Sequence, residues 1–142
     1  MITDRSRPAR PAAHRILVAD EEPLIRWALT ETLTEAGWDV YEAADADAAI
    51  RALSDESHAP DVVLLDHELP GATSLTLLSR IKTAAPRSQT IVMTSYGTPE
   101  IVREALEHGA LRVMEKPLDM VGIPAIAQQA HDACAGRREA GA

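Results

Sequence analysis

The sequence predicts an α/β fold in which helices cover both faces of a doubly wound, five-stranded parallel sheet. Two observations lead to this prediction. Short apolar runs such as Val62–Leu65 and Ile91–Met93 recur along the chain, and longer amphipathic stretches separate them. Apolar runs of this kind are typical of strands that a parallel sheet buries on both faces. Parallel strands need crossover connections, which are usually helices, and right-handed crossovers favour the doubly wound arrangement.

The first half of the chain predicts two strand–helix units and a third strand. A helix can begin at about Pro23, where the missing N–H costs nothing, and Gly37 ends it. The alternation in Trp38–Ala43 indicates a half-exposed edge strand, and Asp45 suits the N-cap of the next helix. The predicted elements are strand Arg15–Ala19, a helix from Pro23 with an apolar stripe at Ile25, Leu29, Leu33 and Ala36, strand Trp38–Ala43, helix Asp45–Ser54 and, after a break at Pro60, strand Asp61–Asp66.

The second half continues the same alternation. Leu69–Gly71 is a turn signal, and Gly109 closes a helix. Gly122 and Pro124 fall near the start of the last helix, which we place at Pro124. The predicted elements are helix Ser74–Ala84, strand Thr90–Thr94, helix Pro99–His108, strand Leu111–Glu115 and helix Pro124–Ala135. We expect one domain over residues 14–136, a flexible Arg- and Pro-rich tail over 1–13 and a short tail over 137–142.

The composition is that of a globular protein with an aliphatic core. The chain has 142 residues, 46% of them hydrophobic, and contains no phenylalanine. Its net charge of −8 disfavours binding to nucleic acid and to anionic membranes. We find no apolar stretch long enough to span a bilayer and no signal peptide, so we expect a cytoplasmic protein. The only cysteine, Cys134, can form no intrachain disulfide, and we interpret it as a thiol without a role.

Four short motifs lie where predicted strands end: Asp20–Glu22, Asp66, Thr94–Ser95 and Lys116–Pro117. The strands of a parallel sheet end at one edge, which is where such sheets bind ligands. The motifs should therefore meet in one pocket that holds several carboxylates, a hydroxyl and an ammonium. This combination suits a divalent cation and a phosphoryl group.

Asp66 is the candidate nucleophile, because a carboxylate can accept a phosphoryl group as an acyl phosphate. Donor and acceptor are both anionic, so the reaction needs charge neutralisation. We expect Asp20 and Glu21 to supply it by holding Mg²⁺, with Asp66 and a backbone carbonyl near Glu68 completing the protein ligands.

Lys116 and Thr94 are expected to contact the phosphoryl oxygens, the first as a point charge and the second as a hydroxyl donor. Before phosphorylation Lys116 would pair with the carboxylates and reduce their repulsion. The Lys116–Pro117 bond can be cis at modest cost, which would make a sharp turn that aims the ammonium inward.

Each of these residues also has a structural interpretation. Acidic residues at strand ends often cap helices, Asp66 and Thr94 could shape local turns, and a lysine before proline is unremarkable alone. The functional interpretation depends on all four motifs sharing one edge. Two other site classes are disfavoured: His58 and His67 lack the spacing of zinc ligands, and no glycine-rich phosphate loop is present.

Four segments carry a family resemblance: Ile16–Pro23, Val63–Gly71, Ile91–Gly97 and Gly109–Pro117. In order and spacing they resemble the receiver domains of bacterial response regulators, across about residues 14–134. The resemblance implies a flavodoxin-like strand order 2-1-3-4-5 and phosphorylation of Asp66 by a sensor histidine kinase or a histidine phosphotransfer protein. It assigns Mg²⁺ to Asp20 and Glu21, the switch hydroxyl to Thr94 and the phosphoryl contact to Lys116. It implies a switch that acts on a downstream protein, with self-phosphotransfer and autodephosphorylation as its only chemistry, and a homodimer is compatible with it.

Three positions depart from the pattern of the family. Glu21 stands where a second aspartate is usual, and its longer side chain could change the position and affinity of the metal. Val113 stands where strand five usually has an aromatic ring that moves with the threonine; Tyr96 could partly replace that ring or be a plain loop residue. Ser74 stands where a glycine is usual.

Three functions stay open: a phosphorylation-driven switch, a pseudo-receiver that binds partners independently of phosphorylation, and a phosphatase or dehalogenase with an aspartate nucleophile. Glu21 and Val113 motivate the second, whereas no cap or additional acid–base residue supports the third. On the first helix Leu24, Trp27 and Ala28 form a second semi-apolar stripe. Trp27 either helps to dock the kinase or a phosphotransfer protein, or it packs against the N-terminal tail or the last helix.

Overall fold

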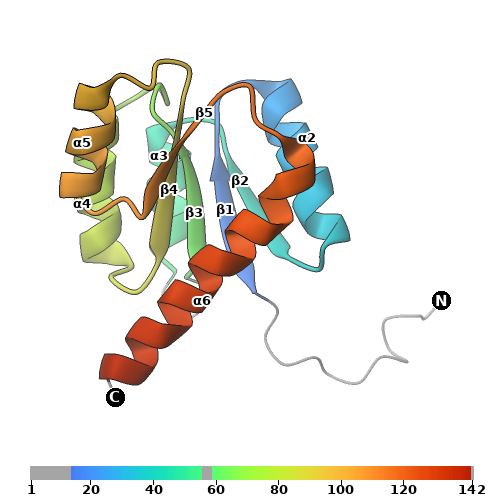
Figure 1. The fold of residues 1–142 in the computed structure, drawn as a ribbon, viewed down its shortest axis with the longest axis vertical. Helices are drawn as coiled ribbons and strands as arrows, with labels where there is room; N and C mark the ends of the chain where they lie inside the picture. The colour runs from blue at the N-terminus through green and yellow to red at the C-terminus, as the bar shows by residue number, and fades with distance from the viewer. Residues whose placement is uncertain (1–13, 56–58, 142) are drawn as a thin grey trace.

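The structure is a computed structural model that describes residues 14–55 and 59–141 (Figure 1). The predicted tail over residues 1–13 and His58 lie outside the described residues. Five parallel strands form one sheet in the order β2-β1-β3-β4-β5, which confirms the predicted fold class. The strands are β1 (Arg15–Ala19), β2 (Asp39–Ala43), β3 (Val62–Asp66), β4 (Gln89–Thr94) and β5 (Arg112–Glu115). The helices are α2 (Pro23–Glu35), α3 (Ala46–Leu53), α4 (Ser74–Ala84), α5 (Pro99–Glu107) and α6 (Ile123–Gly141), with a 3₁₀ turn, η2 (Met120–Gly122), before the last.

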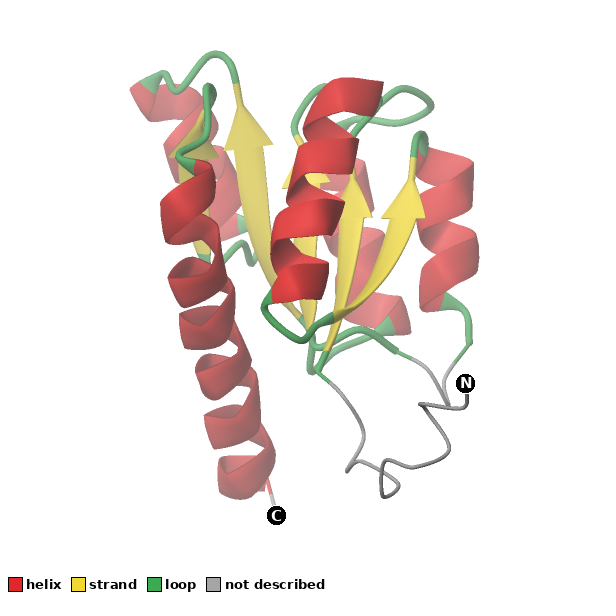
Figure 2. Cartoon of the chain, turned by 90° about the vertical axis from the view of Figure 1, so that its right-hand side faces the viewer, coloured by secondary structure: helices red, strands yellow, loops and turns green. Residues whose placement is uncertain are grey.

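Both faces of the sheet are buried, because successive strand side chains point to opposite sides. On one face Val18, Leu64 and Met93 belong to a core cluster with residues of α2 and α6. On the other face Leu65 and Val92 belong to a cluster with residues of α3, α4 and α5. Figures 1 and 2 show the resulting three layers, with α2 and α6 on the side of the sheet opposite to α3, α4 and α5. The apolar runs were therefore strands buried on both faces, as predicted.

The predicted helix ends are supported by local geometry. Asp45 caps α3, because its side chain accepts a hydrogen bond from the backbone N–H of Ala48. Pro23 occupies the first turn of α2, where no N–H partner is needed. Gly37 and Gly109 follow the ends of α2 and α5 with φ of +99° and +102°, a conformation that side chains with a Cβ rarely adopt.

Two details of the helix predictions were wrong. The last helix does not end near Ala135 but continues to Gly141, because residues 135–141 contain alanine, arginine and glutamate, which favour helices, and no proline. Ala36 does not belong to the buried stripe of α2; it is the exposed C-cap residue, whereas Leu29 and Leu33 are fully buried. The domain boundary at residue 136 stays a prediction.

Candidate functional site

The carboxyl ends of β1, β3 and β5 bring a lysine and three carboxylates together. Lys116, directly after β5, places its Nζ 2.8 Å from Oδ2 of Asp20 and 3.5 Å from Oδ2 of Asp66. The same Nζ lies 3.3 Å from Oε1 of Glu22. We call Asp20, Glu22 and Asp66 the carboxylate cluster. Asp20 and Lys116 are separated by 96 positions in the chain, so the sheet topology alone brings them together.

Asp20 is held by its backbone as well as its side chain. Its N–H donates to the carbonyl of Ala43 at the end of β2 (3.0 Å), and its Oδ1 accepts from the N–H of Glu22 (2.9 Å). Arg26 of α2 donates from Nη1 to the carbonyl oxygen of Asp20 (2.7 Å) and from Nε to Oε1 of Glu42 on β2 (3.2 Å). The arginine therefore ties the loop after β1 to two neighbouring elements.

Asp66 ends β3 and lies at the floor of the site, where it is only 2% exposed. Its Oδ1 accepts a hydrogen bond from the N–H of Glu68 (3.0 Å). Burial raises the pKa of Asp66 above its ordinary value of 3.8; the hydrogen bond from Glu68 lowers it, the charge of Asp20 raises it, and the charge of Lys116 lowers it. The net shift of the pKa is upward, so the folded environment disfavours the ionised form of Asp66 relative to water. A further cation would stabilise this ionised form.

The pKa of Lys116 is also raised, but by its carboxylate neighbours and against the effect of burial. Burial lowers the pKa of Lys116, but the hydrogen bond to Asp20 and the charges of Asp66 and Asp20 raise it. The net result is a pKa above the ordinary value of 10.5. Its side chain is 6% exposed. The Lys116–Pro117 bond is cis, as the sequence allowed. The backbone N–H of Lys116 donates to the carbonyl of Thr94 (2.8 Å), so this turn is fixed to the end of β4.

Thr94 is the last residue of β4 and is fully buried. Its Oγ1 accepts a hydrogen bond from the N–H of Tyr96 (3.0 Å) in the loop before α5. A hydroxyl has one proton to donate as well as lone pairs, so it can keep this contact while it donates to another oxygen. The ring of Tyr96 is 65% exposed. Val113, the departure on β5, is half-buried against the core cluster beneath α3, α4 and α5.

Sequence reasoning missed two contacts of the site. Glu22 was named in the motif after the first strand but was given no role, and its carboxylate contacts Lys116. The assignment of the neighbouring Glu21 to Mg²⁺ stays a prediction. Arg26 was not predicted at all. Its position on the first turns of α2, one helical turn after Glu22, is the signal that could have found it, because residues there lie above the loop that carries the carboxylates.

The donors present suit Mg²⁺, although they are not arranged as a closed metal site. Within residues 14–55 and 59–141, no three Asp, Glu, His or Cys residues form a group that could hold a metal ion as they stand. Asp20 and Asp66 nevertheless already share one cation, the ammonium of Lys116. Their oxygens, with the exposed Glu21 and the loop at Glu68, are the hard donors that this ion prefers. The types of donor present therefore fit the ion.

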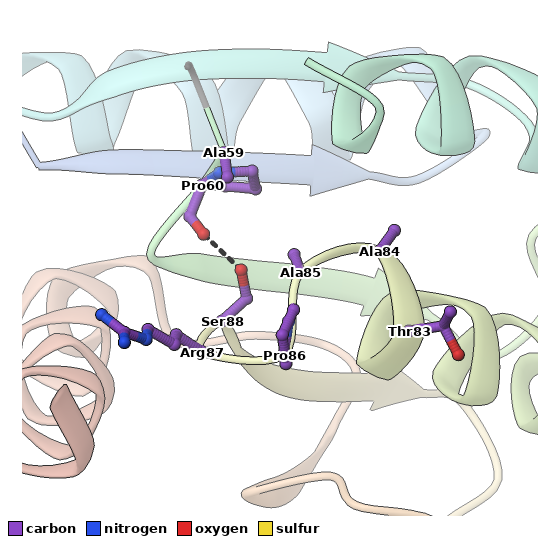
Figure 3. A pocket seen from close by; sticks show the side chains of 8 residues that line it. All are labelled: Ala59, Pro60, Thr83, Ala84, Ala85, Pro86, Arg87 and Ser88. Atoms are coloured by element: carbon purple, nitrogen blue, oxygen red, sulfur yellow. Dashed lines mark hydrogen bonds between the residues drawn. The ribbon is translucent and has the colours of Figure 1, made fainter. Parts of the chain in front are cut away.

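A different hollow lies at the opposite edge of the sheet. Figure 3 shows it between the segment before β3 and the end of α4. Its volume is about 390 Å³. Ser88, just before β4, donates to the carbonyl of Pro60 beside it. The walls of the hollow carry one cation, Arg87, and no carboxylate, so the hollow lacks the chemistry of the carboxylate cluster.

In the described part of the chain, no helix has both the length and the apolar character needed to cross a bilayer.

Comparison with known proteins gives a consistent result. Residues 16–128 match the model of the response regulator receiver domain. The chain is 34% identical over 106 residues to sporulation initiation phosphotransferase F of Bacillus subtilis, which covers 75% of this chain and 84% of that protein. It is 34% identical over 116 residues to the transcriptional regulatory protein PdtaR of Mycobacterium tuberculosis, covering 79% of this chain and 54% of that protein.

The solved structures agree with the sequences. NtrX from Brucella abortus superposes with a TM-score of 0.82 and 32% identity, over 92% of this chain and 30% of that one. A CheY-like receiver domain protein from Methanospirillum hungatei superposes equally well, with a TM-score of 0.82 over 89% of this chain and 99% of that one, but at 23% identity it supports the fold alone. Several matched proteins are longer than this chain, which spans 24% of NtrC from Escherichia coli.

Proposed function

Because this chain belongs to the response-regulator receiver family, we propose that it is a phosphorylation-dependent switch whose phosphoryl group is carried by Asp66. The observation that carries the proposal is the ammonium of Lys116, which lies between the carboxylates of Asp20 and Asp66 at 2.8 and 3.5 Å. An acceptor carboxylate, a second carboxylate for a metal and a cation for the phosphoryl oxygens are the groups that this chemistry needs. We infer that the donor is a sensor histidine kinase or a histidine phosphotransfer protein.

In the proposed transfer, a carboxylate oxygen of Asp66 attacks the phosphorus of a phosphohistidine. A P–O bond forms and the P–N bond breaks; its electron pair leaves on the imidazole, which departs neutral because its other nitrogen carries a proton. Since Asp66 is buried beneath Lys116, we propose that the ammonium moves from the carboxylate to a phosphoryl oxygen during uptake. The Thr94 hydroxyl would donate to another oxygen, and later attack by water would release phosphate.

Asp20, Glu21 and Asp66, with the backbone carbonyl of Glu68, would hold Mg²⁺. When bound, the ion supplies positive charge to the phosphoryl oxygens and to the two buried carboxylates. The raised pKa of Asp66, caused first by burial and further by the charge of Asp20, supports this assignment, because it indicates that Lys116 alone does not fully compensate the cluster.

The test is a Mg²⁺ titration followed by phosphoryl uptake. Calorimetry should show saturable Mg²⁺ binding, and beryllofluoride, an analogue of the phosphoryl group, should bind only when Mg²⁺ is present. Incubation with acetyl phosphate and Mg²⁺ should add one acid-stable, base-labile phosphoryl group, and Asp66→Asn should abolish it while the circular dichroism spectrum stays unchanged. Uptake by the Asp66→Asn protein would show that another residue is the acceptor.

A second candidate is a pseudo-receiver, an interaction module that needs no phosphorylation. Two observations favour it: no group of three metal-binding side chains is formed within the described residues, and Val113 replaces the usual aromatic ring. Such a module need not respond to Mg²⁺. If neither Mg²⁺ nor beryllofluoride binds at millimolar concentration and the partner set is the same for wild type and Asp66→Asn, the pseudo-receiver is the correct assignment.

The face of α2 beside the site is where we expect the phosphoryl donor to dock. Trp27 is 62% exposed and Leu24 80% exposed, and Val121 of η2, which contacts α2, is 90% exposed. The alternative that Trp27 packs against the last helix is not supported, because most of its surface is exposed. The alternative that it packs against the N-terminal tail concerns residues outside those that the structure describes. Trp27→Ala should slow transfer from a phosphorylated kinase while uptake from acetyl phosphate stays normal; equal losses in both reactions would rule out a docking role.

For the output, we propose contact with a downstream protein, which follows from the switch mechanism. The named relatives include a phosphotransferase and transcriptional regulators, so the chain alone does not select the target. We propose a cytoplasmic location, where histidine kinases have their catalytic domains, and autodephosphorylation as the reset. A homodimer formed on phosphorylation is a further proposal, which sedimentation with and without beryllofluoride would test.

A further inference from the structure

His67 and Ser74 lie at the two ends of the loop that follows the proposed phosphoacceptor, and their side chains contact each other. Nδ1 of His67 lies 2.7 Å from the hydroxyl oxygen of Ser74. Ser74 is the first residue of α4 and is 3% exposed, and His67 directly follows Asp66. The hydroxyl can donate to the ring nitrogen or accept from it, so the contact is compatible with either imidazole tautomer. A glycine at position 74 could not make it.

The backbone of the same loop is fixed at its start. The N–H of His67 donates to the carbonyl of Met93 (2.7 Å), which continues the pairing of β3 with β4 by one residue. The N–H of Glu68 donates to Oδ1 of Asp66, and the N–H of Leu69 donates to the carbonyl of Asp66 (3.1 Å). The orientation of the Asp66 carboxylate therefore depends on the loop staying in place.

Between this anchored start and α4 the chain turns at Gly71, whose φ is +106°. The His67–Ser74 hydrogen bond spans the turn and joins the start of the loop to the first residue of the helix. Because Ser74 is buried and sits on a helix, it is the rigid partner, and His67 is the group that it holds. A loop closed in this way keeps the Glu68 N–H at the acceptor carboxylate.

We propose that His67 and Ser74 are positioning residues that latch the phosphoacceptor loop and keep Asp66 oriented for phosphoryl uptake. Neither side chain is placed on the transferred group, so neither is catalytic; both act through the Glu68 N–H and the Asp66 carboxylate. The inference rests on the proposed function of Asp66. It also gives a role to two residues of this sequence, a histidine without ligand spacing and a serine at a position where a glycine is usual.

The test compares variants that break the hydrogen bond with one that keeps it. Ser74→Ala and His67→Leu each remove one partner, whereas His67→Asn places an amide oxygen close to the position of Nδ1. Ser79→Ala is the matched control, since Ser79 is an exposed serine of the same helix. If the Ser74→Ala protein does not fold, Ser74→Gly is used in its place, because it removes the same hydroxyl. Two quantities are measured: the affinity for beryllofluoride with Mg²⁺, and amide hydrogen exchange at Glu68 and Leu69 in the metal-free protein.

Loss of the hydrogen bond should change both the beryllofluoride affinity and the amide exchange rates by about twofold to tenfold. Ser74→Ala and His67→Leu should weaken beryllofluoride binding and speed the exchange of both amides by this factor. The double variant should lose no more than either single variant, and His67→Asn should lie near wild type. The proposed latch would be contradicted if the loss in the double variant equalled the product of the losses in the two single variants. It would also be contradicted if His67→Asn were as impaired as His67→Leu.

Failure of the latch and failure of the proposed function give different results. If wild type does not bind beryllofluoride, the function assigned to Asp66 is wrong, and the exchange rates alone decide whether the pair closes the loop. If wild type binds it and all variants exchange and bind as wild type does, the function stands and the latch is wrong.

Discussion

Replacing Lys116 with methionine should weaken the fold and, at the same time, tighten Mg²⁺ binding. The ammonium is the cation shared by the carboxylate cluster, at 2.8 Å from Asp20 and 3.5 Å from Asp66. Both aspartates are buried, with 0% and 2% exposure. Removal of one partner from a buried ion pair typically costs about 3–5 kcal/mol, because the other charge stays without compensation. Methionine keeps most of the aliphatic volume, so this cost reflects charge rather than packing.

The effect of pH on this variant has a definite sign. Burial already raises the pKa of Asp66, and without the Lys116 charge, which lowers that pKa in the wild type, it rises further. A carboxyl group whose pKa is higher in the folded than in the unfolded state binds more protons when folded. The free energy of unfolding should therefore increase as the pH falls through the raised pKa of Asp66 toward the lower pKa of the unfolded state. The wild type should also lose stability above pH 10.5, as Lys116 deprotonates through its raised pKa, and the variant should lack this loss.

Mg²⁺ should rescue the variant, because the ion and the ammonium compensate the same carboxylates. The assay is urea denaturation at pH 5 and pH 7, with and without Mg²⁺, together with calorimetric Mg²⁺ titration of the folded proteins. Lys82→Met is the matched control, since Lys82 is the only other lysine of the chain and lies on α4. The reasoning is refuted if Lys116→Met binds Mg²⁺ no more tightly than wild type, or if acidification from pH 7 to pH 5 changes its stability no more favourably than that of Lys82→Met.

Substitutions at three further positions test individual contacts. Asp66→Asn should leave the fold as stable as wild type or more stable by up to about 1 kcal/mol, because it removes a buried charge that is only partly compensated, and urea denaturation measures this. Thr94→Ala should cost about 1–3 kcal/mol by leaving the N–H of Tyr96 without its acceptor, whereas Thr94→Ser should restore most of the loss in the same assay. Arg26→Met should weaken Mg²⁺ binding about threefold to tenfold in calorimetry by releasing the carbonyl of Asp20, and unchanged affinity would contradict that role.

The fold and the location of the site follow from the sequence for one physical reason. A strand buried on both faces must be apolar throughout, so a run such as Val62–Leu65 is visible without any knowledge of its neighbours. Once the strands are parallel, their carboxyl ends share an edge, and Asp20, Asp66, Thr94 and Lys116 are assigned to that edge by topology alone.

Contacts within the site depend on details that the pattern does not contain. Whether Glu21 or Glu22 faces Lys116 is set by the direction that the backbone takes after Asp20, where the N–H of Glu22 turns back onto the aspartate. Arg26 reaches the same loop only because a long side chain extends from α2 toward the strand ends. The apolar pattern of the sequence also did not predict the end of α6, because residues with high helix propensity can extend a helix past the part that packs against the sheet.

The charge balance of the cluster gives a reason for a metal-dependent switch. Three carboxylates, of Asp20, Glu22 and Asp66, share the single ammonium of Lys116, so the site carries an excess of negative charge before any phosphoryl group arrives. Phosphorylation replaces the charge of one carboxylate with about −1.5 to −2 on the phosphoryl oxygens. One ammonium cannot neutralise both groups, and a shift of Lys116 toward the phosphoryl oxygens leaves Asp20 without its partner. A divalent cation held by Asp20 would resolve this conflict, so the proposed switch predicts that phosphoryl uptake and Mg²⁺ binding are coupled, each raising the affinity for the other.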